Sequence, residues 1–453
     1  MASTYLTRTP SGAGTNSKIF TLSLWIKRCG LGASQSMMGT GNSSGYSSIF
    51  LEFNSDDKLR FAQINAQGAS PTFEFEYITN RVFRDVNAWY HIVCTVDSTD
   101  STEADRVKIY VNGVRETSFS TTNHAGSNST FLWNDARVHS IGRHGEWSAR
   151  YQNGVMSHIH NIDGTAYQAS TFGSTDATTG EWKINTSPSV TYGTNGFFVL
   201  KDGNSGTDQS PNTNNFTVGA GTLTKTEDNP SNVFATMNPL NHYEGQTFSN
   251  GNTNVQTISG NGSHKQFVST LGVSSGKFYW ELKNHLANTS SSRIGISSES
   301  VIRKYTNLTG SGGHVGDDPE SYAYVGSNGY KENNDSASSY GNSFQSGDIL
   351  MVALDMDNNK VYFGKNGTWQ NSGDPTSGST GTGAAFTVTA GLKYYPACSI
   401  LGGGGEAYQW NFGNGYFKTT AISSAGTNAS ALGIFEYDVP AGYSALCTKG
   451  LNL

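Results

Sequence analysis

The sequence has few charged residues and no long apolar run. Charged residues make up 14% of the chain, and Lys and Arg are nowhere clustered. Because nucleic-acid binding depends on grouped cations that neutralise phosphates, this pattern excludes a nucleic-acid-binding surface. The longest apolar run, residues 349–354, is far shorter than the ~20 residues that span a bilayer. We therefore expect no nucleic-acid partner and no membrane insertion.

Cysteine is also scarce. The four cysteines, at positions 29, 94, 398 and 447, show neither a CxxC motif nor the spacing of a metal site. The N-terminus lacks a charged segment followed by an apolar one, so we expect no signal peptide and synthesis in a cytoplasm. In that compartment the cysteines remain thiols, and most of them are expected to pack as small apolar residues.

What the chain does contain is turn-forming and aromatic residues. There are 54 glycines, many Asn, Ser and Thr, and an aromatic share of 12%. Few residues favour long helices, whereas the Tyr and Phe supply enough bulk for a folded core. At 453 residues the chain is too long for one sandwich, since domains cluster near 100–200 residues. This composition predicts an all-β protein with two large domains.

Alternating apolar and polar residues predict the strands of the first half. The segments with this period are 20–28, 73–79, 89–97 and 107–113. Asn112 and Gly113 form the dipeptide that a type I′ hairpin requires, because both central residues need positive φ. Antiparallel strands joined by short turns, without helical periods between them, predict a β-sandwich.

The second half repeats this organisation after a Gly/Asn/Ser-rich stretch at 245–264, which predicts a domain boundary. In the segment 276–283, Phe278, Trp280 and Leu282 share one face of a strand. Residues 349–354 are apolar on both faces and predict a central strand, followed by a turn at 357–359.

These blocks resemble two known folds. SLWIKR, WYHIVCTVD and RVKIYVNG are similar to the laminin-G-like or concanavalin-like jelly roll, which covers residues 1–165. The Tyr-Trp-Glu strand of GKFYWELK, the Gly-Asp and Leu-Asp hairpin at 347–369, the Tyr-Pro of YYPACSI and the closing YQWNFG resemble the SPRY domain over 265–415. Departures at 371–384 and 401–406 prevent any transfer of binding residues from that family. The implied fold is two tandem concanavalin-like and SPRY-like antiparallel β-sandwiches (jelly rolls) with an irregular connector.

The connector, residues 166–264, carries the most specific resemblance. IDGTAYQASTFGSTDATTGEW, YGTNGFFVL and DNPSNVFATMNPL resemble a run found in tail and virion proteins of bacteriophages. Trp182, Phe197, Phe198 and Phe234 are expected to pin this segment onto its neighbours. The last residues, 416–453, have strand character and are expected to pack on the second domain or against a partner.

The phage resemblance implies a virion structural protein, made in the host bacterium and exposed on the particle surface. We expect a tail fibre or appendage that binds host cell-surface polysaccharide without catalysis, contacts other virion proteins and forms a homo-oligomer, preferably a trimer. A capsid decoration or head-spike protein is an alternative that the sequence leaves open. An intracellular SPRY adaptor is another.

A polysaccharide-degrading enzyme is a further alternative, since concanavalin-like sandwiches also host glycosidases with two facing carboxylates. Glu74 and Glu76 have the spacing of one strand face, but the following acid of the glucanase signature is missing. Alternating Phe and Glu are also typical of any strand with one buried and one solvent-exposed face. We prefer this structural interpretation of the two acids.

We predict no required cofactor, although two metal sites are conceivable. His158 and His160 would share an outward strand face and could bind a metal if further ligands converge, with His139 and His144 nearest in sequence. The acidic residues Asp97, Asp100, Glu103 and Asp105 suit calcium or a solvated loop equally.

Aromatic residues in turn-rich segments are the candidate ligand contacts, because such side chains stack on sugars or anchor partners. These are Trp147, Tyr151, Tyr330 and Trp369. Each of them suits a core position equally well.

Overall fold

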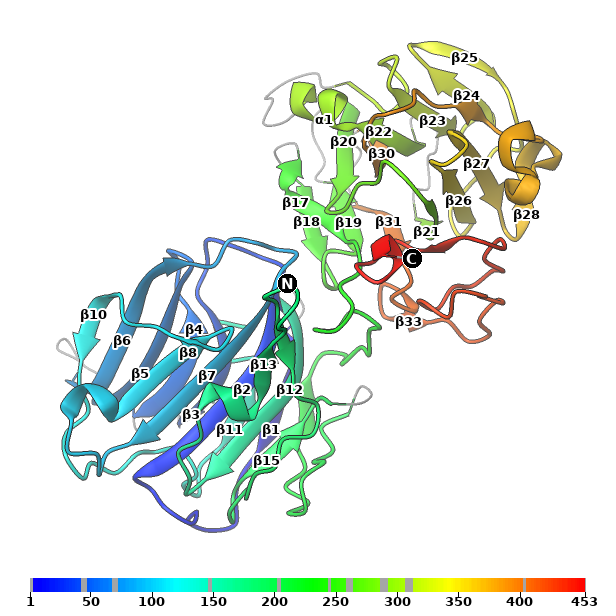
Figure 1. The fold of residues 1–453 in the computed structure, drawn as a ribbon. Coiled ribbons are helices and arrows are strands. Elements are labelled where there is room, and N and C mark those ends of the chain that lie inside the picture. Colours follow the sequence, from blue (N-terminus) through cyan, green and yellow to red (C-terminus); the bar gives the residue numbers. More distant parts are fainter. Residues whose placement is uncertain are drawn as a thin grey trace. The chain divides into compact units, whose positions relative to one another are not determined.

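The computed structural model describes residues 3–41, 47–66, 72–145, 149–201, 205–242, 246–257, 264–285, 292–305, 313–401 and 405–452. The chain divides into unit 1, Met1–Lys225, and unit 2, Thr226–Leu453. Each unit contains two large, almost entirely antiparallel sheets, which Figure 1 shows as ribbons. The expected all-β class with two sandwiches is confirmed.

Unit 1 encloses its core between an eight-stranded and a six-stranded sheet. In spatial order, the first contains β10 (Phe119–Asn123), β6 (Thr72–Val82), β5 (Lys58–Ala66), β4 (Ser48–Phe53), β3 (Gln35–Gly41), β11 (His139–Ile141), β1 (Tyr5–Arg8) and β16 (Thr217–Ala220). The second contains β15 (Phe197–Val199), β12 (Gly154–Asp163), β2 (Ile19–Arg28), β7 (Trp89–Asp97), β8 (Val107–Val111) and β9 (Val114–Arg115). As predicted, the alternating Phe20, Leu22 and Leu24 of β2 are buried in this core.

The β8–β9 turn shows why glycine is needed at its second position. Asn112 and Gly113 have φ values of 49° and 79°, as the type I′ prediction required. A Cβ on Gly113 would lie 2.3 Å from the Trp182 ring, so this position also allows the connector to approach closely. Trp182 belongs to a small hairpin of β13 (Gly173–Thr175) and β14 (Trp182–Ile184).

The segment predicted as a connector is divided between the two units. Its first part completes unit 1, because β15 pairs with β12 and β16 pairs with β1. Phe172, Trp182 and Tyr192 from this part pack against the outer face of the six-stranded sheet. Its second part supplies strands to unit 2, so the stretch at 245–264 contains paired strands, and the division between the units lies at 225/226 instead.

Unit 2 is built from a seven-stranded and a nine-stranded sheet. The first has the order β17 (Met237–His242), β20 (His264–Ser269), β30 (Tyr394–Leu401), β22 (Arg293–Ser298), β23 (Ser321–Val325), β24 (Tyr330–Asn333) and β25 (Ser336–Ser339). The second has β18 (Gln246–Ser249), β19 (Asn254–Thr257), β31 (Gly405–Asn411), β21 (Lys277–Asn284), β26 (Ile349–Asp355), β27 (Lys360–Lys365) and β28 (Thr368–Trp369), with β29 (Phe386–Thr387) on β27 and β34 (Ser444–Ala445) on β21.

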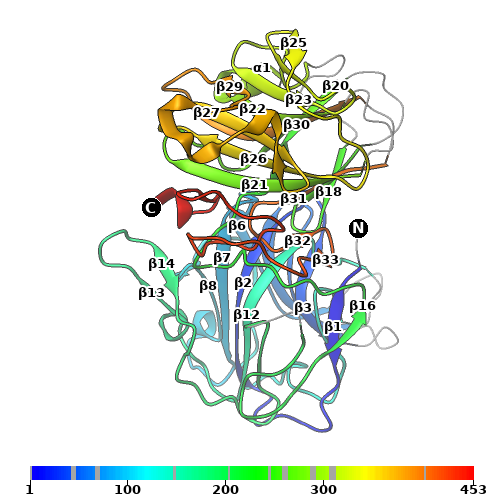
Figure 2. The same ribbon diagram turned by 90° about the vertical axis from the view of Figure 1, so that its right-hand side faces the viewer.

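The C-terminal segment covers the second face of the nine-stranded sheet. Leu350 and Val352 of β26 face the core between the sheets, whereas Met351 packs with Phe435 and Tyr443 on the other side. Figure 2 shows this segment, in red, along the β21 side of unit 2, where β34 pairs in parallel with β21. The predicted central strand at 349–354 is confirmed, and so is the packing of the chain end on its own domain.

Helices are few and short in the described residues. They are α1 (Glu299–Tyr305) and the 3₁₀ turns Glu103–Asp105, Ala169–Thr171, Gln370–Ser372, Pro375–Thr380 and Gly450–Asn452, beside a last small hairpin of β32 (Tyr416–Phe417) and β33 (Thr420–Ala421). Within this part of the chain, none of the helices has the length and apolar character needed to cross a membrane.

Candidate functional site

Charged and aromatic residues gather on the outward face of the eight-stranded sheet in unit 1. Ile49 and Leu51 of β4 face the core, so the strand period places Phe50 and Glu52 on the opposite side. The outer-face cluster, as we name it, consists of Phe50, Glu52, Arg60, Glu76 and Arg150. Arg60 lies directly across from Glu52 in β5 and connects the two acids. Its Nη1 is 3.3 Å from Glu52 Oε1, and its Nη2 is 2.6 Å from Glu76 Oε1.

Two residues from irregular segments, His144 and Arg150, are attached to this cluster. Arg150 Nη1 donates to both carboxylate oxygens of Glu52, at 3.0 and 2.9 Å. His144 packs on Phe50 with ring centroids 4.2 Å apart. Burial first, and then the nearby Arg150, lower the pKa of His144 to about 3, so this ring is neutral at physiological pH. Arg150 is therefore held on the sheet by charged hydrogen bonds, and His144 by an aromatic contact.

The cluster balances two guanidinium groups against two carboxylates. Glu52 is buried, with 1% of its side chain exposed, whereas 39% of the Arg150 side chain is exposed. The guanidinium carbons of Arg60 and Arg150 lie 5.1 and 6.0 Å from the centre of the Phe50 ring. Phe50 is fully buried, so the partly exposed Arg150 guanidinium is the group of this cluster that is most open to a polar ligand.

Of the two loop aromatics predicted in unit 1, Tyr151 is half-buried, with its ring 6.0 Å from that of Tyr5. It directly follows Arg150, so it lies beside the outer-face cluster. Trp147 lies outside the described residues.

The acids considered for glycoside hydrolysis have structural partners. Glu76 is held by Arg60, and Glu74 Oε2 accepts a hydrogen bond from the Asn65 amide at 2.8 Å. A glycosidase needs one carboxyl group to donate a proton and the other to attack or activate water. Both acids therefore have partners within the sheet, a guanidinium for Glu76 and an amide for Glu74.

His158 and His160 do not form the expected outward pair. The strand register shifts between Ser157 and His160, and His158 has a positive φ of 48°. His160 is buried, stacks on Phe198 with ring centroids 3.9 Å apart and shares a hydrogen bond with the Tyr192 hydroxyl. Burial lowers the pKa of His160 well below its usual value. The outward placement was wrong because the connector folds back over this face.

The other candidate metal ligands in unit 1 each have a separate partner. His139 Nδ1 hydrogen-bonds to the Arg137 carbonyl, and His144 Nε2 to the Ser48 hydroxyl. In the acidic loop, Asp100 pairs with Lys108 and Asp105 with Arg115. Separate partners of this kind are typical of a solvated loop and not of a calcium site.

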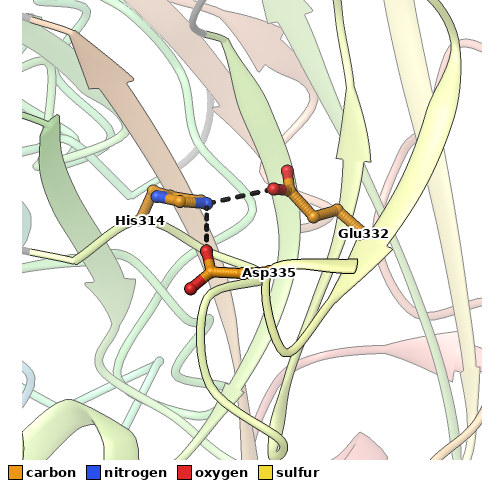
Figure 3. A group of neighbouring side chains, drawn as sticks. All are labelled: His314, Glu332 and Asp335. Atoms are coloured by element: carbon orange, nitrogen blue, oxygen red, sulfur yellow. Dashed lines mark hydrogen bonds and ion pairs between the residues drawn. The ribbon is translucent and has the colours of Figure 1, made fainter. Parts of the chain in front are cut away.

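Within the described ranges of the chain, three potential metal ligands converge at one place, in unit 2. Figure 3 shows His314 Nε2 facing the carboxylates of Glu332 and Asp335, at 3.2 and 3.6 Å. His314 precedes β23, Glu332 lies on β24, and Asp335 lies in the turn between β24 and β25. Arg293 on β22 holds the other side of Glu332, with Nε 2.6 Å from Oε2.

A family model matches residues in each of the two units. Residues 2–170 match the family model described as Concanavalin A-like lectin/glucanases superfamily, and residues 277–415 match that of the SPRY domain. The chain therefore joins a concanavalin A-like domain to a SPRY domain. Solved structures similar to it include the SPRY domain of human HERC1, at 20% identity, a TM-score of 0.29 and coverage of 38% of this chain and 96% of that one. A second human SPRY domain has 16% identity, a TM-score of 0.28 and coverage of 37% and 94%.

Two further proteins share similarity over part of their length. Stonustoxin has 18% identity and a TM-score of 0.29, over 39% of this chain and 27% of the toxin chain. The E3 ubiquitin-protein ligase RKP of Arabidopsis thaliana is 35% identical over 108 residues, which are 23% of this chain and 7% of the ligase. The chain thus spans a small part of that relative.

The SPRY domain contains the other two predicted aromatic contacts. Tyr330, at the start of β24, is 38% exposed and remains a candidate contact. Trp369 is half-buried and packs edge-to-face against Tyr279, with ring centroids 6.3 Å apart. The structure therefore places Trp369 at the border of the packing under the C-terminal segment.

We expect Trp369→Ala to lower the free energy of unfolding of the SPRY domain by about 2–3 kcal/mol, because a large, partly buried ring loses its contacts. Urea unfolding followed by circular dichroism measures this change. Tyr330→Ala serves as the matched control and should change stability by less than about 0.5 kcal/mol. If Trp369→Ala were as stable as the wild type, Trp369 would again be a candidate ligand contact.

A buried carboxylate joins the body of the SPRY domain to the C-terminal segment. Glu281 on β21 accepts hydrogen bonds from the Tyr279 hydroxyl at 2.8 Å and from the backbone N–H groups of Glu436 and Tyr437 at 2.9 and 2.8 Å. The Asn411 amide also donates to it, at 3.3 Å. Burial raises the pKa of Glu281 to about 7 against the effect of these donors.

Sequence reasoning missed the outer-face cluster and the His314 group. Glu52 and Arg60 do occupy polar positions of alternating strands, so their shared face was detectable once β4 and β5 were paired. Arg150 and His314 lie in irregular segments, so the local sequence does not predict which side chains they contact. The dipeptide Asn334-Asp335 is a turn signal that could have located the third ligand.

Proposed function

We propose that this chain is a structural protein on the surface of a bacteriophage particle, a tail fibre or appendage that binds host polysaccharide without cleaving it. The phage-like run over residues 162–240 supports the particle assignment. The outer-face cluster carries the binding assignment, because it joins fixed charged groups to a loop with a half-buried Tyr151.

The chemistry of this surface suits a sugar ligand. Sugar rings offer flat apolar faces and many hydroxyl groups, so they need aromatic contacts and donors that are already in position. Arg150 is oriented by Glu52 and partly exposed, while Tyr151 follows it in the chain. Binding per site is expected to be weak, and an oligomer, for which we favour a trimer, would raise the avidity.

We expect Tyr151→Ala to weaken polysaccharide binding by about 5- to 30-fold, the effect of losing about 1–2 kcal/mol at a contact. An array of bacterial capsular and lipopolysaccharide glycans, followed by titration of the best ligand, measures the change. The unfolding temperature should stay close to that of the wild type.

Tyr330→Ala is the matched control, since it removes an exposed tyrosine from the SPRY domain. If Tyr330→Ala and not Tyr151→Ala lost binding, the site would lie in the SPRY domain. If the intact chain bound no glycan but attached firmly to capsids, the decoration protein would replace the appendage. Electron microscopy of labelled particles separates these two positions directly.

A further inference from the structure

Two segments of the SPRY domain, the β24–β25 hairpin with Glu332 and Asp335 and the segment with His314, meet at these three side chains, and a hydrogen bond explains only part of this arrangement. Imidazole Nε2 carries at most one hydrogen, which can point at one carboxylate. Glu332 Oε1, at 3.2 Å, takes that role, whereas Asp335 Oδ1, at 3.6 Å, is beyond a good hydrogen bond. A cation between the three groups would contact all of them at once.

The spacing of the ligand atoms fits a small metal ion. All three atoms lie within 4.8 Å of one another. Ligands bound at about 2.0–2.2 Å in a tetrahedral zinc site are separated by about 3.3–3.6 Å. The two separations from His314 Nε2, 3.2 and 3.6 Å, come close to this range without any rearrangement. Calcium, which takes six to eight oxygens, fits this set poorly.

The surroundings orient the ligands and leave a path for the ion. Asp335 has 72% of its side chain exposed, whereas His314 has 17% and Glu332 has 9%. Arg293 Nε donates to Glu332 Oε2 at 2.6 Å, whereas its Nη2 reaches Oε1 only at 3.5 Å, so His314 Nε2 at 3.2 Å is the nearer partner of Oε1. Burial raises the pKa of Glu332, but hydrogen bonds from His314 and Arg293 outweigh it and give a value of about 2.

A second histidine lies next to the group. The ring of His264 is 4.9 Å from that of His314, and its Nδ1 is buried without a hydrogen-bond partner among the described residues. This unpartnered ring nitrogen belongs to a residue that directly neighbours the proposed ligands.

The position of the Asp335 carboxylate is set by a tight turn. Asn333 pairs with Ser336, so Asn334 and Asp335 form a two-residue turn, with φ values of 52° and 55°. Glycine is favoured at the second position of such a turn, and Asp and Asn are the other residues that tolerate positive φ there. Asp335 is compatible with this turn, and its Oδ1 lies 3.6 Å from His314 Nε2.

We propose that His314, Glu332 and Asp335 bind a divalent transition-metal ion of the zinc type. The ion would tie the β24–β25 hairpin, at the edge of its sheet, to the segment before β23. Tyr330 begins this hairpin, so the ion would also limit the motion of that exposed side chain.

The test is a titration of the full chain, freed of metal by a chelator, with Zn²⁺ and separately with Co²⁺. We expect one ion per chain, a Co²⁺ absorption spectrum with nitrogen and oxygen ligands, and a rise in unfolding temperature on adding Zn²⁺. Asp335→Asn and His314→Ala should weaken binding by at least about 10-fold. Asp335→Asn keeps a residue that tolerates positive φ, so the hairpin remains folded.

Two controls make the outcome decisive. Asp335→Gly should be at least as stable as the wild type without metal, yet it should lose the Zn²⁺-dependent rise. His158→Ala removes a candidate ligand of the other unit and should bind Zn²⁺ like the wild type. Equal Zn²⁺ binding by wild type, Asp335→Asn and His314→Ala would overturn the proposal. Binding of Ca²⁺ but not Zn²⁺ would also overturn it. Absence of any metal binding would overturn it too and would mean that the three residues form ion pairs only.

Discussion

A fragment of residues 265–415, the extent of the SPRY resemblance, should not fold, whereas residues 226–453 should fold independently. The shorter fragment lacks β17, β18 and β19, which occupy the ends of both sheets. It also lacks the C-terminal segment that buries Met351 and Tyr362. Phe435, Val439 and Tyr443 alone contribute about 5–9 kcal/mol by burial. That amount is comparable to the whole stability of a domain, about 5–15 kcal/mol.

Expression of both fragments, with circular dichroism and a cooperative unfolding transition as the readout, tests this expectation. Residues 226–415 form an informative intermediate, because they restore the three strands but not the C-terminal segment. We expect this third fragment to aggregate through the exposed face of the nine-stranded sheet. A soluble, cooperatively unfolding fragment 265–415 would mean that the added strands and the segment are dispensable.

Glu281→Ala should lower the free energy of unfolding of the SPRY domain by about 3–5 kcal/mol. The substitution leaves the backbone N–H groups of Glu436 and Tyr437 and the Tyr279 hydroxyl without their acceptor. Each buried polar group that loses its partner costs about 1–3 kcal/mol, while removal of a buried charge offsets part of this loss. Urea unfolding of residues 226–453 at pH 7.5 measures the difference.

The matched control is Glu436→Gln, which neutralises a partly exposed acid in the same region. Its stability should lie within about 0.5 kcal/mol of the wild type. Equal stability of Glu281→Ala and wild type would show that the C-terminal segment is held by apolar packing alone.

The same carboxyl group makes stability depend on pH. Its pKa is raised from 4.5 to about 7 in the folded state, mainly by burial. Between these two values the folded chain retains a proton that the unfolded chain has lost, so the contribution of Glu281 to stability falls as pH rises from 4.5 through 7. In Glu281→Gln this part of the slope should be absent.

Local patterns predicted the strands well, because the two-residue period follows directly from burial of one face. The apolar residues of β2 and β21 lie in the cores where the alternation placed them. Residues apolar on both faces of β26 correctly indicated a strand covered on two sides. The covering segment itself, around Phe435 and Tyr443, lies far along the chain and has no periodic signal.

The site residues were harder to predict because they depend on long-range packing. The two-residue strand period places His160 on the solvent-exposed face, yet Tyr192 and Phe198 from the connector cover it. The shift of register beside His158 also breaks the simple two-residue count. Likewise, the contact of Asp335 with His314 exists only because the β24–β25 turn lies against the segment at 316–318, whose carbonyls accept from its backbone. Neither the burial of His160 nor the contact between Asp335 and His314 can be predicted from the local sequence.

The pairing of β1 with β16 bears on when the protein can finish folding during synthesis. Leu6 lies beside Val218, and β15, at Phe197–Val199, ends the other sheet of unit 1. Contacts between such distant residues must wait for loop closure and slow the folding of a domain. A ribosome therefore has to release about half of the chain before the N-terminal strand gains its last neighbour. Until then, that strand keeps an open edge that other chains could pair with.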